Sequence, residues 1–188
     1  MATHKKREQA DIERLSELES RIGYHFSDSS YLVRAVTRKA YSNEQRQRGL
    51  IFPDQEIYST LGDAVLKLVL TDRLIGKGLG NPEEITRAKE GLERKETLAQ
   101  IGRALMIGPV ILLGKGEQKQ LAGDQPYVLA ETLEAIIGAI YLDGGYLKAA
   151  ITIQSWFDSI LPRDREESQP IGTSYPLFRP GSQRKSAD

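Results

Sequence analysis

Two glutamates inside an apolar segment are the first residues of this sequence that indicate chemistry. Residues 127–142 contain Glu131 and Glu134 and no other charged side chain. Because they lie three residues apart, a helix would place both carboxylates on one face, beside a stripe of leucine and isoleucine. Such a pair is typical of an ordinary solvated helix face, but beside a core it is also suited to bind a cation.

A further acid occurs in a similar setting earlier in the chain. Residues 57–70 carry only two charges, Asp63 and Lys67. Their spacing of four is that of a helical ion pair worth a few tenths of a kcal/mol, and this simple interpretation remains open. A carboxylate held against a core costs several kcal/mol unless it is paired or binds a cation, so a metal site is the alternative.

Glycines beside these acids favour the metal site. Gly62 precedes Asp63, and Gly138 lies one turn beyond Glu134. Each glycine costs about 1 kcal/mol relative to alanine within a helix, and glycines in such positions commonly let two helices approach closely. A close approach would bring the acids of the two segments together. Carboxylate oxygens prefer hard cations such as Mg²⁺ or Mn²⁺, and the sequence has no cluster of cysteine or histidine to bind a softer metal.

The composition is that of an ordinary globular protein, with 39% hydrophobic and 28% charged residues. No apolar run approaches the roughly 20 residues of a membrane-spanning helix, so we expect no membrane insertion. Residues 1–7 lack the apolar stretch of a secretory signal, and the absence of cysteine fits a cytoplasmic protein. The 26 basic and 26 acidic residues balance, so any contact with nucleic acid depends on local clusters of positive charge.

The pattern of apolar residues and helix breakers predicts an all-α protein. We expect helices over residues 11–22, 31–41, 54–75, 82–95, 96–106, 127–142 and 146–161. We interpret residues 42–52 and 115–124 as loops and residues 110–113 as a short strand or a buried turn. One domain over residues 8–161 and a flexible tail over residues 162–188 are predicted, because so short a tail cannot form a second core.

Four segments resemble sequence blocks of the ribonuclease III family. The chain has VTRKAYSNE at 36–44, LGDAVL at 61–66, LLGKGE at 112–117 and EAIIGAIYLDGG at 134–145. These blocks follow the order found in the family, and the resemblance spans residues 12–161. It implies a ribonuclease III-type helical endonuclease domain that forms a two-fold homodimer. It also implies cleavage of double-stranded RNA with Mg²⁺, for which Mn²⁺ substitutes, leaving 5′-phosphate and 3′-hydroxyl ends.

The resemblance also assigns roles to the acids. Asp63 and Glu134 match the catalytic acids of the family, and both are expected to ligate the metal. Glu131 stands where the family usually has a metal-binding Asp, and Glu84 matches a further acid that supports the metal through water. The resemblance therefore implies an Mg²⁺-dependent endoribonuclease of RNA processing. Ribosomal RNA is the natural substrate for this family, and antisense or structured messenger RNA is equally compatible.

Ser59 is the main departure from the family. The usual signature NERLEFLGD is replaced by QEIYSTLGD at 55–63, so a neutral hydroxyl stands in place of a metal-binding Glu. The compact Mini-III branch also lacks this acid and the double-stranded RNA-binding domain, yet it cuts RNA. Two other functions therefore remain open. One is a catalytically impaired RNA-binding or scaffolding protein of the same fold, and the other is an unrelated helical hydrolase of nucleotides.

Basic residues concentrate at 34–48 and 87–95 and at Lys115 and Lys119. In a dimer each patch is doubled, which favours a groove for the phosphates of an RNA duplex, recognised mostly by shape and backbone. Scattered solvated charge is the alternative interpretation. The apolar character of residues 52–61 favours a dimer interface there.

Overall fold

The computed structural model describes residues 13–160, and within this range the chain forms helices and no strand. The all-α prediction is therefore confirmed. A first helix covers residues 13–22. It is followed by α2 (Ser30–Ala35), α3 (Lys39–Arg46), α4 (Glu56–Gly76), α5 (Pro82–Leu92), α6 (Lys95–Ala104), η1 (Gly108–Val110), α7 (Lys115–Lys119), η2 (Ala122–Asp124) and α8 (Pro126–Ile160). The predicted tail, and residues 8–12 and 161 of the predicted domain, lie outside the described range.

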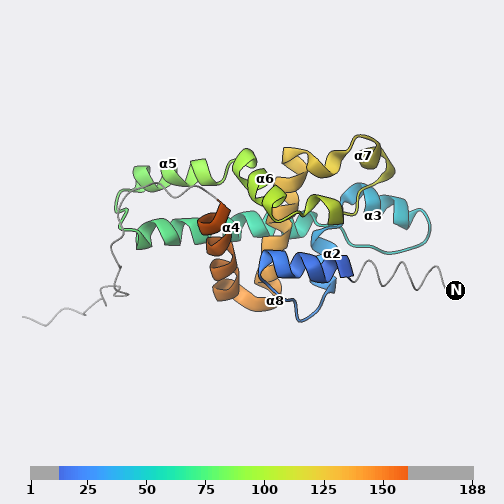
Figure 1. Cartoon of the computed structure of the whole chain (residues 1–188), viewed down its shortest axis with the longest axis horizontal. Helices are drawn as coiled ribbons and strands as arrows, with labels where there is room; N and C mark the ends of the chain where they lie inside the picture. The colour runs from blue at the N-terminus through green and yellow to red at the C-terminus, as the bar shows by residue number, and fades with distance from the viewer. Residues whose placement is uncertain (1–12, 161–188) are drawn as a thin grey trace, which may run out of the picture.

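Two long helices, α4 and α8, cross at the centre of the molecule (Figure 1). Helices α6 and α2 pack on α8, and α5 lies alongside α4. The buried side chains of the crossing are mainly aliphatic: Val65, Leu66, Val69 and Leu70 on α4, and Val128, Leu129, Leu133, Ile136, Ile137 and Ile140 on α8. Removing this apolar surface from water drives the two helices together. The crossing in turn fixes the position of every acid that the two helices carry.

Helix α8 consists of two helical segments that meet at Gly145. The backbone there has a φ of 74°, a left-handed conformation that glycine adopts without steric cost. In Figure 1 the first segment runs down past α4, and the second turns back upward. The predicted break between the helices over 127–142 and 146–161 is therefore confirmed. By length and composition alone α8 is apolar enough to cross a membrane, but half of the stretch concerned is buried inside the fold, as in a core helix.

The predicted single helix over residues 31–41 is wrong, because the chain forms α2 and α3 instead. Between them, the amide of Leu112 donates to the carbonyl of Val36 at 2.8 Å, and the amide of Arg38 donates to the carbonyl of Leu112 at 3.1 Å. Thr37 is fully buried at this isolated bridge. These bonds to a distant segment replace helical ones. They place Arg38 at the start of α3, where its side chain contacts residues of α7 and α8.

The two predicted loops contain helix. Helix α3 extends into residues 42–52 as far as Arg46, and residues 115–124 form α7 and η2. The carboxylate of Glu117 accepts from the amide of Gly114 at 3.1 Å, which caps the start of α7. This short-range cap was visible in the sequence only as a charged, glycine-containing stretch.

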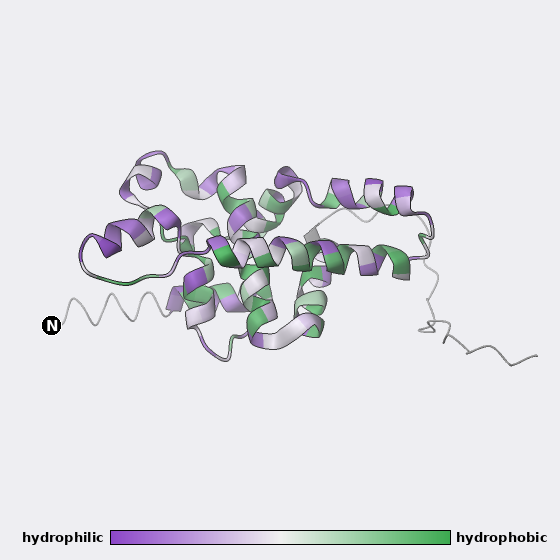
Figure 2. Ribbon diagram, turned by 180° about the vertical axis from the view of Figure 1, so that it is seen from behind, coloured by the Kyte–Doolittle hydropathy of each residue, from purple (hydrophilic) through white to green (hydrophobic). Residues whose placement is uncertain are grey.

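Helix α5 begins at Pro82 as predicted, but it ends at Leu92 and not at residue 95. The side chain of Asn81 accepts from the amide of Glu83 at 2.9 Å and caps the first turn. Figure 2 shows α5 as largely hydrophilic, and none of its residues is fully buried. It packs along α4 and leads the chain back toward the crossing.

Candidate active site

Gly62 of α4 and Gly138 of α8 lie where the two helices touch. A Cβ atom built on Gly62 would lie 1.7 Å from the backbone oxygen of Glu134, and one built on Gly138 would lie 2.2 Å from that of Tyr58. Real Cβ atoms essentially never approach other atoms below 3.0 Å, so only glycine fits at either position. The close approach expected from the sequence is confirmed. It sets Asp63, which follows Gly62, beside the segment that carries Glu134.

Glu134 sits half-buried among other charges. Burial is the largest cause that raises the pKa of its carboxyl group, to about 7, and the negative charges of Asp63 and Glu131 raise it further. Lys67 and Lys95 oppose the shift. These acids from two helices therefore share one electrostatic environment, in which a carboxylate is stabilised by any added cation.

Asp63 makes the local ion pair that its spacing allows. The Nζ of Lys67 lies 2.7 Å from the Oδ2 of Asp63, and both side chains are about half exposed. The hydrogen bond from Lys67 to Asp63 is the main cause that raises the pKa of this lysine. The simple interpretation of the pair is therefore confirmed. It coexists with the proximity of Asp63 to Glu134, so it does not exclude a site for a metal.

Glu131 is paired with Arg38, a contact that the sequence analysis missed. The guanidinium of Arg38 donates to Glu131 through Nη1 and to Glu117 through Nε, the latter at 3.1 Å. Burial by itself lowers the pKa of Arg38, but hydrogen bonds and charges from Glu131 and Glu117 raise it overall. Only 13% of the Arg38 side chain is exposed. The negative charge of Glu131 is thus already compensated by a cation of the protein.

Arg38→Met is expected to lower the free energy of unfolding by about 2–3 kcal/mol. The substitution keeps an unbranched side chain but leaves Glu131 and Glu117 without the positive charge that binds them both. The loss is smaller than for a fully buried pair, because 36% of the Glu131 side chain is exposed. Urea unfolding followed by circular dichroism measures it. Lys39→Met is the matched control, because it breaks an exposed 2.9 Å pair with Glu56 and is expected to have little effect. Equal losses in the two variants would contradict the prediction.

Glu84 is not brought to the other acids in this arrangement. It lies exposed in the first turn of α5, next to the turn that follows α4. Asp63 lies about 20 Å from that turn along the axis of α4, at a rise of about 1.5 Å per residue. The two carboxylates are therefore separated by most of the length of the α4–α5 pair.

Ser59 is buried one turn before Asp63 on α4. Its hydroxyl donates to the backbone oxygen of Glu56 at 3.0 Å. The hydroxyl is therefore satisfied within its own helix and adds no negative charge beside Asp63. The serine noted in the sequence is therefore a neutral, internally bonded residue of α4.

Glu93 is a further acid near the crossing, and the sequence analysis missed it. It directly follows α5. Its Oε1 is buried and has no hydrogen-bond partner among the described residues. The Nζ of Lys89 lies 3.9 Å from this oxygen and forms a loose ion pair with it. Burial is the largest cause that raises the pKa of Glu93; Lys89 and Lys67 lower it, and the charge of Asp63 raises it. No sequence signal distinguishes this glutamate from a surface charge. The return of α5 along α4 is what brings it near Asp63.

The donor chemistry of this region suits a hard cation. Within residues 13–160, no three acidic, histidine or cysteine side chains are grouped closely enough to hold a metal ion by themselves. Mg²⁺, however, is commonly bound by only one or two carboxylates and keeps waters and substrate phosphate oxygens as its other ligands. Asp63 and Glu134 supply such a pair. Glu93 adds a further, partly buried carboxylate near this pair, and Lys89 lies 3.9 Å from its Oε1.

Some basic residues that were expected to contact RNA are used inside the protein. The guanidinium of Arg34 lies 4.5 Å from the centre of the Tyr58 ring and donates through Nε to the backbone oxygen of Asp54 at 3.0 Å. Arg38 is held by its two glutamates. Other basic side chains of the predicted patches lie exposed on α5, α6 and α7, among them Arg87, Lys95, Lys115 and Lys119.

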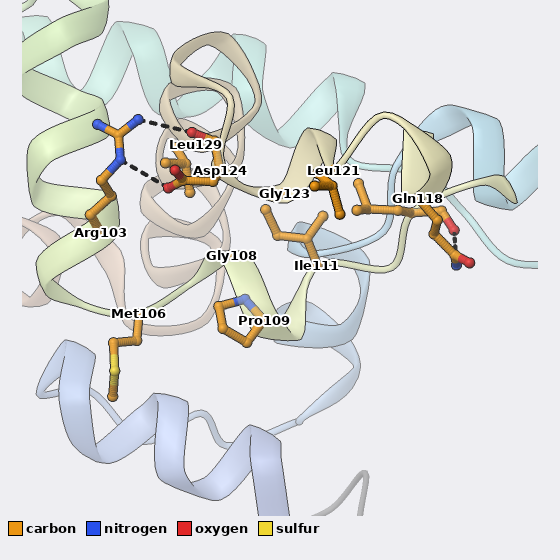
Figure 3. A pocket seen from close by; sticks show the side chains of 11 residues that line it. Arg103, Met106, Gly108, Pro109, Ile111, Gln118, Leu121, Gly123, Asp124 and Leu129 are labelled. Atoms are coloured by element: carbon orange, nitrogen blue, oxygen red, sulfur yellow. Dashed lines mark hydrogen bonds and ion pairs between the residues drawn. The ribbon is translucent and has the colours of Figure 1, made fainter. Parts of the chain in front are cut away.

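A surface hollow of about 710 Å³ lies elsewhere, between α6, η1 and the α7–η2 segment (Figure 3). Its lining is mainly apolar and includes the exposed side chains of Met106 and Leu121. The two charged residues in it, Arg103 and Asp124, are paired at 2.9 Å. None of the predicted site residues lines this hollow, so its size does not identify the active site.

Comparison with known proteins connects the chain to ribonucleases. A family model described as Ribonuclease-III-like matches residues 28–160. Ribonuclease 3 of Streptomyces coelicolor is 38% identical over 156 residues, which cover 82% of this chain and 53% of the relative. Ribonuclease 3 of Oleidesulfovibrio alaskensis is 37% identical over 147 residues, covering 78% of this chain and 63% of the relative. The chain thus spans somewhat more than half the length of these relatives.

Solved structures show the same architecture. The nuclease domain of ribonuclease III from Campylobacter jejuni matches with a TM-score of 0.71 and 29% identity, over 79% of this chain and 96% of that domain. Another structure of that domain, concerned with flexibility in a region involved in dimer formation, matches with a TM-score of 0.71 and 28% identity. It covers 78% of this chain and 97% of its own length.

Proposed function

Because the chain belongs to the ribonuclease-III-like family, we propose that it is an endoribonuclease that cuts double-stranded RNA with Mg²⁺ or Mn²⁺. The observation that carries the proposal is the contact of α4 and α8 at Gly62 and Gly138. This contact sets Asp63 beside Glu134 on a rigid scaffold, which is what a metal-binding pair of carboxylates requires.

Asp63 and Glu134 are the proposed metal ligands and catalytic acids. When bound, a divalent cation lowers the pKa of its water and neutralises charge on the phosphodiester. Glu134 gains most from the cation, because burial and neighbouring acids disfavour its charge in the metal-free protein. Glu131 is held by Arg38 through one carboxylate oxygen, so its other oxygen is the proposed further ligand. Glu84, which lies far from Asp63 within one chain, is the proposed acid that supports the site through water.

Duplex RNA is the proposed substrate, cut to leave 5′-phosphate and 3′-hydroxyl ends in RNA processing such as ribosomal RNA maturation. Basic side chains on α5, α6 and α7 supply exposed positive charge for the phosphates, among them Arg87, Lys95 and Lys115. The formal net charge of the chain is zero. We therefore expect RNA binding to be weak and to fall steeply with salt.

A two-fold homodimer is part of the proposal. Ile51 and Ile57, before and at the start of α4, are 90% and 68% exposed, and Leu68 on α4 is also exposed. Apolar side chains of this size gathered near one helix favour burial against a partner. The relative from Campylobacter jejuni has a region involved in dimer formation.

Incubation of the purified protein with a labelled, perfectly paired RNA duplex tests the proposed function. We expect cleavage with Mg²⁺ at about 10 mM, a concentration chosen to saturate a weak site, and none with EDTA. Gel analysis of the fragments shows whether the products carry 5′-phosphates. Light scattering of the same sample reports whether the active species is a dimer. An intact duplex at every Mg²⁺ and Mn²⁺ concentration would overturn the proposal.

A second candidate function is an RNA-binding protein of the same fold without catalysis. Ser59 favours it, because its satisfied hydroxyl replaces an acid that the family uses to bind metal. In this case the protein retains the duplex in a filter-binding assay without cutting it. The two candidates are therefore separated by cleavage and binding measured on one sample.

A further inference from the structure

Lys67 is paired with Asp63 and lies in the electrostatic field of acids from two other parts of the fold. Its Nζ lies 2.7 Å from the Oδ2 of Asp63 on α4. The same ammonium interacts electrostatically with Glu93, which follows α5, and with Glu134 on α8. The ammonium therefore pairs directly with one proposed metal ligand, Asp63, and the charges of Glu93 and Glu134 act on it as well.

The surroundings of these acids make the position of the ammonium significant. Glu134 is half-buried at the α4–α8 contact, and Glu93 has a buried oxygen with no hydrogen-bond partner within residues 13–160. Lys95 also acts on Glu134, and Lys89 lies 3.9 Å from Glu93. Lys67 acts on Glu93 and Glu134 as well, and it is the lysine that pairs directly with Asp63. It therefore holds a single positive charge against Asp63, one of the two carboxylates that the proposed function assigns to the divalent cation.

We propose that Lys67 is a built-in counter-cation of the Asp63–Glu134 site, which compensates the acids in the metal-free protein and is displaced when a divalent cation binds. This inference rests on the proposed function and adds to it a residue that sets the metal affinity. The lysine side chain is suited to the role, because its ammonium sits on a flexible stem and is about half exposed. Two cations at one site repel each other, so a bound metal drives the ammonium outward into water.

Metal binding without RNA tests the inference. Isothermal titration of Mn²⁺ or Mg²⁺ into the wild-type protein, Lys67→Met and Lys67→Arg gives the dissociation constants directly. We expect Lys67→Met to bind the metal about 3- to 10-fold more tightly, because it removes the competing charge and keeps the length of the side chain. Lys67→Arg retains a cation and is expected to stay close to the wild type. If Lys67 had only a structural role, the metal affinities of Lys67→Met and Lys67→Arg would not differ in this way.

Arg103→Met is the matched control. It breaks a 2.9 Å ion pair with Asp124, of similar exposure to that of Lys67, beside the hollow of Figure 3 and away from the crossing. Its metal affinity is expected to equal that of the wild type. Thermal unfolding of each variant in EDTA checks that the fold is retained, as the exposed position of Lys67 predicts.

The outcomes separate this inference from the proposed function. Tighter binding by Lys67→Met alone supports the inference. Equal or weaker binding by Lys67→Met, with clear binding by the wild type, overturns the role of Lys67 and leaves the metal-dependent nuclease standing. Absence of metal binding in the wild type and in Lys67→Met overturns the metal site itself, and the role of Lys67 with it.

Discussion

Gly62→Ala is expected to lower the free energy of unfolding by at least about 3 kcal/mol. The added Cβ would lie 1.7 Å from the backbone oxygen of Glu134, and a backbone atom cannot rotate away as a side chain can. Helices α4 and α8 must therefore separate, which opens the most extensive packing contact of the described fold. Urea unfolding in the presence of EDTA measures the loss without a contribution from bound metal.

Gly138→Ala repeats the test from the other helix. Its Cβ would lie 2.2 Å from the backbone oxygen of Tyr58, so the same contact is broken. Gly91→Ala is the matched control on α5. A Cβ there meets nothing within 4 Å, and alanine is expected to stabilise the helix by up to about 1 kcal/mol. Tolerance of alanine at both Gly62 and Gly138 would contradict the close approach on which the candidate site depends.

This contact is also the part of the site that the sequence predicted best. A glycine inside a helix lowers the stability of that helix, so Gly62 and Gly138 had to have a compensating role. A close contact between two helices was the role that the sequence analysis expected. The pairing of Asp63 with Lys67 was predictable for a similar reason, because a spacing of four places two side chains together within one helix.

The contacts that the sequence did not predict are those between distant segments. Thr37 leaves the helical conformation because its neighbours bond to Leu112, and periodicity within residues 31–41 contains no trace of that partner. Glu131 looked like an unpaired acid because Arg38, its partner, lies far away in the sequence. Glu93 becomes part of the site only because α5 folds back along α4. A local pattern predicts local partners, whereas compensation of buried charge is often long-range.

Glu134→Gln is expected to abolish RNA cleavage, by at least about 100-fold, while stabilising the metal-free protein. The pKa of Glu134 is raised to about 7 in the folded protein, from 4.5 when unperturbed. At a pH between these two pKa values, the carboxyl group of Glu134 is protonated in the folded state and ionised in the unfolded state. The free energy of unfolding therefore falls as the pH rises through this window, and the penalty is fully present above it. Glutamine removes the charge and with it the penalty.

The stabilisation expected for Glu134→Gln has a characteristic size and pH dependence, which make the test specific. At about pH 8 we expect the variant to be about 1–2 kcal/mol more stable than the wild type in EDTA, after allowance for solvent screening of a half-buried group. At about pH 4 the difference should be small, because the wild-type carboxyl is mostly protonated in both states. Urea unfolding at the two pH values measures both. A variant that is less stable at the higher pH would show that Glu134 is stabilised by a partner of the protein.

Glu131→Gln is the informative control, because the same substitution three residues away has the opposite expected effect. Glu131 is bound by Arg38, and the substitution leaves Glu117 as the only carboxylate paired with that guanidinium among the described residues. We expect Glu131→Gln to destabilise the protein by about 1–3 kcal/mol at about pH 8. Glu134 carries a charge that the metal-free fold resists, and Glu131 carries one that the fold already compensates. Opposite signs of the two changes in stability would identify Glu134 as the acid that is poised for a cation, independently of any assay of cleavage.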